Sequence, residues 1–206
     1  MMTSIRSFIK NLLGKKAFIT IVSGLPRSGT SMMMSALEAG GMTILTDHIR
    51  KADKNNPRGY FEFEPVKRLA KEEFDWLKQA RGKAVKIISS LLVYLPNTFH
   101  YRVIFMQRDL DEILASQQHM LERTGKDHSE SVSVAEIKDL YQNHLQEIIT
   151  WVEEKDWILS QFVNYNDVLL HPQRAMARVS AFLNHSVDPQ AMAKVVDINL
   201  YRERSI

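Results

Sequence analysis

The chain has 206 residues, of which 45% are hydrophobic and 25% are charged, and its formal net charge at pH 7 is +3. This length allows one substantial hydrophobic core and is short for two, and the composition is that of a globular protein rather than a disordered or fibrous one. The lack of cysteine excludes disulfides, thiolate metal sites and cysteine nucleophiles. The small positive charge is compatible with anionic ligands, but no basic stripe indicates a nucleic-acid partner.

The segment 1–16 is a basic amphipathic lead. Its apolar residues recur at helical spacing, with lysine and arginine on the opposite side. It lacks the long apolar core and the cleavage site of a signal peptide, and no apolar run of the chain approaches the roughly 18 residues that would cross a bilayer. We therefore expect a cytoplasmic protein whose lead packs on the domain or frays, with contact to a membrane surface as the less favoured alternative.

Beyond the lead, short apolar runs alternate with helical patterns over residues 17–206. Runs of branched apolar residues predict strands at 17–23, 84–89, 101–107 and 157–165. Apolar residues at helical spacing predict helices at 30–40, 66–80, 110–123, 134–155 and 173–183. The alternation predicts a single α/β domain in three layers, a central parallel sheet flanked by helices, with ligands beyond the carboxyl ends of the strands.

A glycine-containing loop, Gly-Leu-Pro-Arg-Ser-Gly-Thr-Ser at residues 24–31, joins the first predicted strand to the first predicted helix. Consecutive backbone N–H groups in such a turn, at the positive end of a helix dipole, form a socket for an anion. Side-chain donors are added by Arg27, Ser28, Thr30 and Ser31. The plain alternative is a tight connection without a ligand, but the density of donors favours an anion site.

The loop differs from that of a nucleotide triphosphatase at one position. Its glycine spacing is that of a phosphate-binding loop, but Thr30 stands where the lysine would be. The predicted strand at 101–107 ends in Gln107 and is followed by Arg108, which puts a cation where an acidic magnesium ligand would be expected. The sequence therefore predicts an anion socket that works without a metal ion.

A second pair of donors follows the same strand. Arg108 comes directly after it, and Ser116 comes eight residues later, inside the next predicted helix. This spacing allows both side chains to converge on one phosphate if the strand end and the helix pack suitably. The sequence therefore offers a second candidate phosphate site, at the end of a second predicted strand.

Together the two motifs resemble those of the sulfotransferases. Residues 24–31 resemble the family's 5′-phosphosulfate loop, particularly the Pro-Arg-Ser-Gly-Thr form of the Golgi and bacterial branches, and Arg108 and Ser116 match its 3′-phosphate motif. Two further segments, at 56–62 and 163–172, are similar to stretches of bacterial sulfotransferases. The resemblance implies a P-loop-type fold, the co-substrate 3′-phosphoadenosine 5′-phosphosulfate (PAPS) without a metal, and sulfuryl transfer to an acceptor hydroxyl or amine.

The resemblance also implies which residues hold PAPS. The expected nucleotide-binding residues are Arg27, Ser28, Gly29, Thr30, Ser31, Arg108 and Ser116. Tyr165, at the end of the last predicted strand, is placed to reach the nucleotide with its hydroxyl or its ring. The glycine-rich C-terminal segment of the cytosolic branch is absent, and Arg202 in the basic tail either replaces its cations or belongs to a solvated end.

In-line sulfuryl transfer requires cations for the charge that develops on the reacting group. Arg27 is the principal candidate. Lys86, near a strand end, either assists the leaving group or is a solvated lysine at a strand edge. The Lys-x-His of the cytosolic branch is incomplete here, because the segment after Lys86 contains Ser89 but no histidine.

The acceptor also needs a base to take its proton, and Glu62 is the preferred candidate. It follows the segment similar to bacterial members, and a carboxylate among aromatic residues is suited to that role. Related Golgi-type enzymes are thought to use a glutamate. The alternatives are His48 and His100.

Two other classes of function stay open. A P-loop kinase or nucleotide hydrolase is disfavoured by Thr30 and by the missing magnesium ligand. A nonenzymatic protein that uses the nucleotide socket for binding or assembly is kept open by the missing histidine and the short tail. Variable loops would form the acceptor pocket, and neither the acceptor nor the oligomeric state is specified by the sequence.

Overall fold

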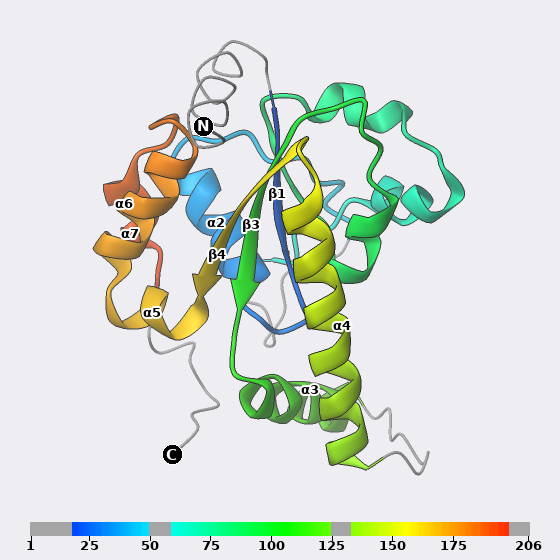
Figure 1. The fold of residues 1–206 in the computed structure, drawn as a ribbon. Helices are drawn as coiled ribbons and strands as arrows, with labels where there is room; N and C mark the ends of the chain where they lie inside the picture. The colour runs from blue at the N-terminus through cyan, green and yellow to red at the C-terminus, as the bar shows by residue number, and fades with distance from the viewer. Residues whose placement is uncertain (1–17, 50–58, 125–132, 198–206) are drawn as a thin grey trace, which may run out of the picture.

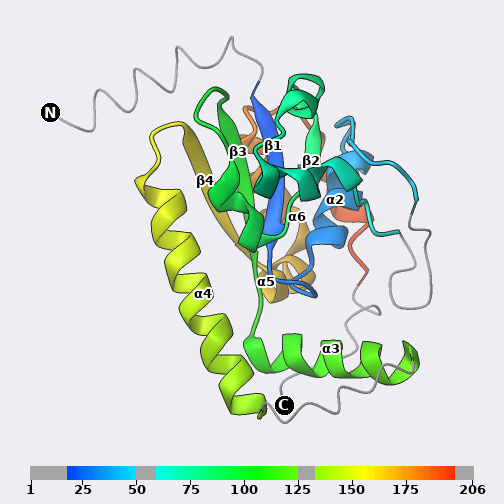
Figure 2. The same cartoon turned by 90° about the vertical axis from the view of Figure 1, so that its right-hand side faces the viewer.

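The computed structural model describes residues 18–49, 59–124 and 133–197. Within these ranges the chain forms one parallel sheet of four strands in the order β2-β1-β3-β4. Figure 1 shows β1, β3 and β4 side by side, and Figure 2 also shows β2 beside β1. The strands are β1 (Ile19–Gly24), β2 (Ala84–Lys86), β3 (Tyr101–Gln107) and β4 (Ile158–Asn164). The predicted lead at 1–16 and the tail that contains Arg202 lie outside the described residues.

Helices pack on both faces of this sheet, so the predicted three-layer α/β fold is confirmed. One face is covered by α2 (Thr30–Ala39), α5 (Tyr165–Leu170), α6 (Pro172–Phe182) and α7 (Pro189–Lys194). The other face is covered by α4 (Val134–Glu154) and by the 3-10 helices η2 (Glu64–Lys71), η3 (Asp75–Ala80) and η4 (Ser89–Tyr94). A further helix, α3 (Leu110–Thr124), lies beyond the carboxyl ends of the strands (Figure 2).

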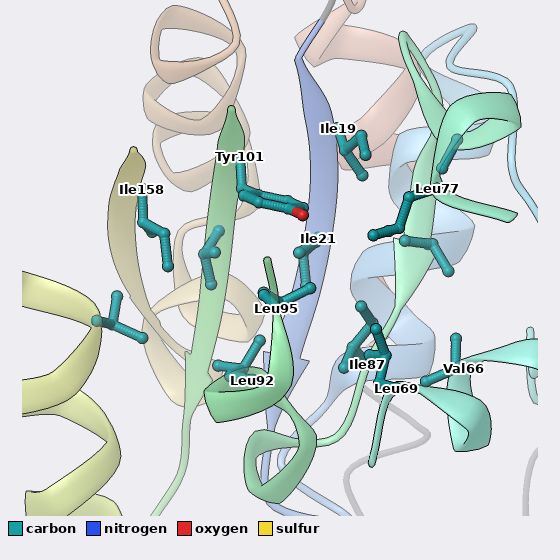
Figure 3. Packing of buried hydrophobic residues seen from close by; sticks show 14 of the residues in the cluster. Ile19, Ile21, Val66, Leu69, Leu77, Ile87, Leu92, Leu95, Tyr101 and Ile158 are labelled. Atoms are coloured by element: carbon teal, nitrogen blue, oxygen red, sulfur yellow. The ribbon is translucent and has the colours of Figure 1, made fainter. Parts of the chain in front are cut away.

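The sheet has a hydrophobic core on each face because its strands are almost continuously apolar. All six residues of β1 are buried, as expected for a parallel strand that is covered on two sides. Successive side chains point to opposite faces, so Ile19 and Ile21 belong to the core under η4 and α4, whereas Val22 belongs to the core under α2. Figure 3 shows Ile19 and Ile21 in the first of these cores together with Leu92 of η4.

Most of the predicted long elements agree with the structure. Agreement to within one residue at each end is found for the strands at 101–107 and 157–165 and for the helices at 30–40, 110–123, 134–155 and 173–183. None of the described helices is both long and apolar enough to cross a membrane.

The predicted helix at 66–80 is wrong. This segment forms the two 3-10 helices η2 and η3, and between them Glu72 adopts a left-handed backbone conformation with φ 59°. A helix cannot continue through such a residue. The buried residues of η2, Val66 and Leu69, are three positions apart, which is one turn of a 3-10 helix. Their spacing is compatible with both kinds of helix, and the tighter one forms.

Other element boundaries also differ from prediction. β2 ends at Lys86, and Ser89, predicted as the end of this strand, begins η4. Tyr165, predicted as the end of β4, is the first residue of α5, because the side chain of Asn164 caps that helix by accepting from two backbone N–H groups. The elements η4, α5 and α7 are not predicted, because each has only six residues and too few turns to show an apolar period.

Substitution of Leu92 tests how η4 is anchored. Leu92 is fully buried, so Leu92→Ala leaves a cavity against the sheet and should lower the free energy of unfolding in urea by about 2–5 kcal/mol. The adjacent Val93 is 40% exposed, and Val93→Ala is a matched control expected to cost less than about 1 kcal/mol. Equal losses in the two variants would contradict this packing.

Candidate functional site

The glycine loop, residues 24–31, leaves the sheet at the carboxyl end of β1 and enters α2. Gly24 has φ 144°, and an added Cβ there would lie 2.6 Å from the carbonyl oxygen of Met106. Gly29, immediately before α2, has φ 98°, and an added Cβ would lie 2.4 Å from Cδ2 of Tyr165. The two glycines therefore allow the loop to approach both β3 and α5 closely, which no other residue would permit without movement.

The loop and the start of α2 are suited to an anion. The helix begins at Thr30, with no acidic residue in its first turn and no side chain capping it, so the positive end of its dipole faces the loop. The hydroxyl of Ser28 is buried and has no hydrogen-bond partner in the part of the chain that the structure describes. This hydroxyl is therefore available to donate to a ligand in the loop.

The structure brings the two predicted phosphate motifs together. Arg27 donates from Nε to Oγ of Ser116 in α3 at 3.0 Å. Arg108, just after β3, donates from Nη1 to the carbonyl oxygen of Arg27 at 3.0 Å. The topology explains this meeting, because β1 and β3 are adjacent parallel strands that end at the same edge of the sheet. The glycine loop, the end of β3 and the start of α3 therefore form one cluster of donors.

The guanidinium of Arg108 is held on several sides. Its Nε donates to Oε2 of Glu112 at 2.8 Å, and both side chains are nearly inaccessible to solvent. The ring of Tyr165 faces the same guanidinium, with its centroid 4.5 Å from Cζ of Arg108. Burial raises the pKa of the Tyr165 hydroxyl, so the phenol is neutral at pH 7 beside the cation. Tyr165 thus contacts Arg108 and lies against Gly29, at the junction of the two motifs.

Lys86 and Glu62 lie on the β2 side of the sheet, where hydrogen bonds to backbone carbonyl oxygens hold the chain in place. Lys86 donates from Nζ to the carbonyl oxygen of Tyr60. The carbonyl oxygen of Glu62 accepts from Oγ1 of Thr46 at 2.9 Å and from the backbone N–H of Asp47 at 3.1 Å. These bonds set the path of the chain at Glu62, whose side chain is half-buried.

Asp47 also ties this segment to the start of η2. Its Oδ2 accepts from the backbone N–H of Glu64 at 2.6 Å, and its Oδ1 accepts from that of Ile49 at 3.0 Å. Slight burial raises the pKa of Asp47, but these hydrogen bonds outweigh it and hold the pKa below its ordinary value. The carboxylate is therefore ionised at neutral pH, and its bonds to the backbone are charge-assisted.

Left-handed backbone conformations occur in both parts of the site. Arg27 in the glycine loop has φ 73°, and on the β2 side Phe61 has φ 51° and His48 has φ 56°. Residues with side chains rarely adopt such angles, which cost of the order of 1–3 kcal/mol each and gather at binding sites and active sites. Among the described residues, Glu72, Asn184 and His185 have such angles as well, so the strain is compatible with a site in these two segments but does not by itself mark one.

The remaining predicted candidates are less well placed. His100 precedes β3, and its carbonyl oxygen accepts from the N–H of Ile19 at 3.0 Å, at the amino ends of the strands. It therefore lies at the edge of the sheet opposite the glycine loop, which disfavours it as the base. His48 is exposed. Arg202 lies outside the described residues, and within those residues no group of three or more histidine and carboxylate side chains could hold a metal ion.

Three side-chain contacts are not predicted from the sequence. Glu112 accepts from Arg108 and, through Oε1, from Nδ2 of Asn166 at 3.2 Å. Its position four residues after an arginine is a signal that the sequence does carry. Ser89, buried at the start of η4, lies 2.8 Å from Nε2 of His144 in α4. These two residues are 55 positions apart, so no local sequence pattern predicts their contact.

Comparison with known proteins gives a fold and no closer assignment. No protein-family model and no curated protein matches the sequence. Among solved structures, the chain is similar to a sulfotransferase domain from the curacin biosynthetic pathway, with 14% identity, a TM-score of 0.52 and coverage of 89% of each chain. At this identity the likeness shows that the two chains share their α/β fold.

Gly29→Ala tests the close approach of the glycine loop to α5. The new methyl group would meet the ring of Tyr165 at 2.4 Å at a residue with φ 98°. Gly41 has a similar φ of 94° but nothing within 4 Å of an added Cβ, so Gly41→Ala isolates the backbone cost, about 1–2 kcal/mol. In urea unfolding, Gly29→Ala should cost at least about 1 kcal/mol more than this control. Identical costs would argue against the contact with Tyr165.

Proposed function

We propose that the protein is a PAPS-dependent sulfotransferase that moves a sulfuryl group to an acceptor hydroxyl or amine. The observation that carries this proposal is the junction of the two phosphate motifs, in which Arg27 contacts Ser116 and Arg108 contacts the backbone of Arg27. The fold shared with a sulfotransferase domain supports it.

PAPS fits the donors at this junction. The glycine loop and the start of α2 bind the 5′-phosphosulfate, and the buried hydroxyl of Ser28, which has no partner among the described residues, donates to it. The other loop ligands are Arg27, Gly29, Thr30 and Ser31. Arg108 and Ser116 bind the 3′-phosphate, and Tyr165 lies beside the nucleotide. Arg202 is a further proposed contact from the tail.

The residues divide the chemistry of transfer among them. PAPS supplies an activated sulfuryl group, whose bond to the 5′-phosphate oxygen breaks as its bond to the acceptor forms. Arg27 stabilises the negative charge that develops on the sulfuryl oxygens, and Lys86 stabilises the departing oxygen. Glu62 takes the proton of the acceptor hydroxyl or amine. The products are the sulfated acceptor and adenosine 3′,5′-bisphosphate.

Thermal unfolding with two nucleotides tests the proposal. A ligand at a hundred times its dissociation constant stabilises the native state by about 2.7 kcal/mol, which gives a visible rise in Tm. We expect this rise with adenosine 3′,5′-bisphosphate in the absence of metal. A rise only with ATP and Mg²⁺ would overturn the proposal in favour of a kinase-like protein. Binding of the bisphosphate without PAPS turnover over a broad acceptor panel would instead indicate a nonenzymatic binding protein.

Arginine variants locate the nucleotide in this assay. A charge-assisted hydrogen bond contributes about 1.5–3 kcal/mol, so Arg27→Ala and Arg108→Ala should each weaken bisphosphate binding at least about tenfold. Because Arg108→Ala leaves Glu112 buried without this partner, Arg108→Lys serves as a second variant that keeps the charge and removes the planar fork. Arg178, exposed on α6, provides the control Arg178→Ala. Unchanged affinity in every site variant would remove the arginines from the nucleotide site.

Glu62→Gln separates catalysis from binding. The amide keeps the shape of the side chain but cannot take a proton, so transfer should fall by about 10²–10⁴-fold while bisphosphate affinity is unchanged. The assay follows labelled sulfate from PAPS to an acceptor found by screening phenols, alcohols and amines. Glu64, two positions along the chain and paired with Lys67 at the surface, gives the matched control Glu64→Gln. Full activity in Glu62→Gln would exclude it as the base.

A further inference from the structure

A buried carboxylate lies within the cluster of donors. The side chain of Glu112, in the first turn of α3, is only 1% exposed. Its two oxygens are both engaged, Oε2 by Nε of Arg108 at 2.8 Å and Oε1 by Nδ2 of Asn166 at 3.2 Å. Removing a carboxylate from water is costly unless it is paired, and buried ion pairs often contribute little net stability. The position of Glu112 therefore calls for an explanation other than stability.

The contacts of Glu112 form a chain that ends at the glycine loop. Asn166 in α5 donates to Glu112, Glu112 accepts from Arg108, and Arg108 donates to the carbonyl oxygen of Arg27. Each contact joins two different parts of the fold: the first joins α5 to α3, the second joins α3 to the residue after β3, and the third joins that residue to the glycine loop. Asn166 thus holds Glu112, and Glu112 holds one edge of the guanidinium.

These contacts fix the orientation of the guanidinium plane as well as its position. Glu112 holds Nε, the carbonyl oxygen of Arg27 holds Nη1, and the ring of Tyr165 faces Cζ from 4.5 Å. An arginine recognises phosphate through a planar fork of donors, so its selectivity depends on the direction in which the fork points. A long side chain fixed in advance also loses less conformational freedom when the ligand binds.

We propose that Glu112 is a positioning residue which, braced by Asn166, orients Arg108 toward the 3′-phosphate and so sets the preference for 3′-phosphorylated nucleotides over those with a 3′-hydroxyl. This inference rests on the proposed function, because it assumes that Arg108 meets the 3′-phosphate. It assigns Glu112 no contact with the nucleotide.

The test compares two nucleotides that differ only in the 3′-phosphate. Isothermal calorimetry gives the dissociation constants of adenosine 5′-monophosphate and adenosine 3′,5′-bisphosphate, and their ratio measures what the 3′-phosphate contributes. In the parent protein we expect the bisphosphate to bind at least about tenfold more tightly. In Glu112→Ala this ratio should fall to within about threefold of unity, while the affinity for the monophosphate changes less than about threefold.

Three further variants make the result specific. Glu112→Gln keeps a carbonyl oxygen that can accept from Nε of Arg108, so it should restore part of the ratio. Asn166→Ala removes the brace and should lower the ratio while leaving Glu112 in place. Glu122, exposed near the end of the same helix, gives the matched control Glu122→Gln, which should behave as the parent protein.

The outcomes separate this inference from the proposed function. No binding of the bisphosphate to the parent protein, or no preference for it, would overturn the nucleotide site itself. A parental preference that persists in Glu112→Ala would leave the site standing and overturn the positioning role. An equal loss of affinity for both nucleotides would mean that Glu112 only maintains the fold, and would also overturn it. If Glu112→Ala does not fold, the ratio of the two dissociation constants in Glu112→Gln and Asn166→Ala decides whether Glu112 has the positioning role.

Discussion

The hydrogen bond from Arg108 to the carbonyl oxygen of Arg27 is the contact on which the site depends. Arg27 has a left-handed backbone with φ 73°, a conformation that costs of the order of 1–3 kcal/mol and persists only where the surroundings impose it. Two contacts impose it here, the bond from Arg108 to its backbone and the bond from its own side chain to Ser116. The loop is therefore shaped by residues more than 80 positions away in the sequence, as the separations of 81 and 89 show.

The parallel sheet makes these distant contacts possible. β1 pairs with β3 along its whole length, so the segments that follow them emerge side by side at one edge. The connection between these strands contains the glycine loop, α2, the edge strand β2 and the 3-10 helices η2, η3 and η4. Its helices pack on the two faces of the sheet, so the carboxyl edge is left to the glycine loop and α3. The glycines then bring the loop to within contact of β3 and α5. Backbone packing thus sets the distance between the phosphate motifs, and side chains set their orientation.

Sequence patterns predict the strands and helices whose apolar pattern extends over many residues. β1 and β3 are continuous apolar runs and the long helices have a helical period, so β3 and these helices are predicted to within one residue, and β1, predicted at 17–23, to within two. The region 66–80 fails because residues three apart suit a 3-10 helix as well as an α-helix, and only tertiary packing selects between them. The loop donors and the Arg108–Ser116 pair have local spacing that can be recognised. The contact between Ser89 and His144 joins two elements remote in sequence, which no single-sequence pattern encodes.

The two halves of the site are built differently, and this difference bears on how acceptor choice can vary. Around Arg27 and Arg108, most of the bonds join one side chain to another, so a change in one side chain disturbs its partner. On the β2 side, the bonds from Lys86, Thr46 and Asp47 reach the backbone of Tyr60 and Glu62, and backbone carbonyls are the same for every residue type. The path of the chain there can consequently be kept while side chains other than the donors Lys86 and Thr46 and the proposed base Glu62 are exchanged. Under the proposed function, a fixed half around Arg27 and Arg108 and an exchangeable β2 half would allow one fold to serve different acceptors.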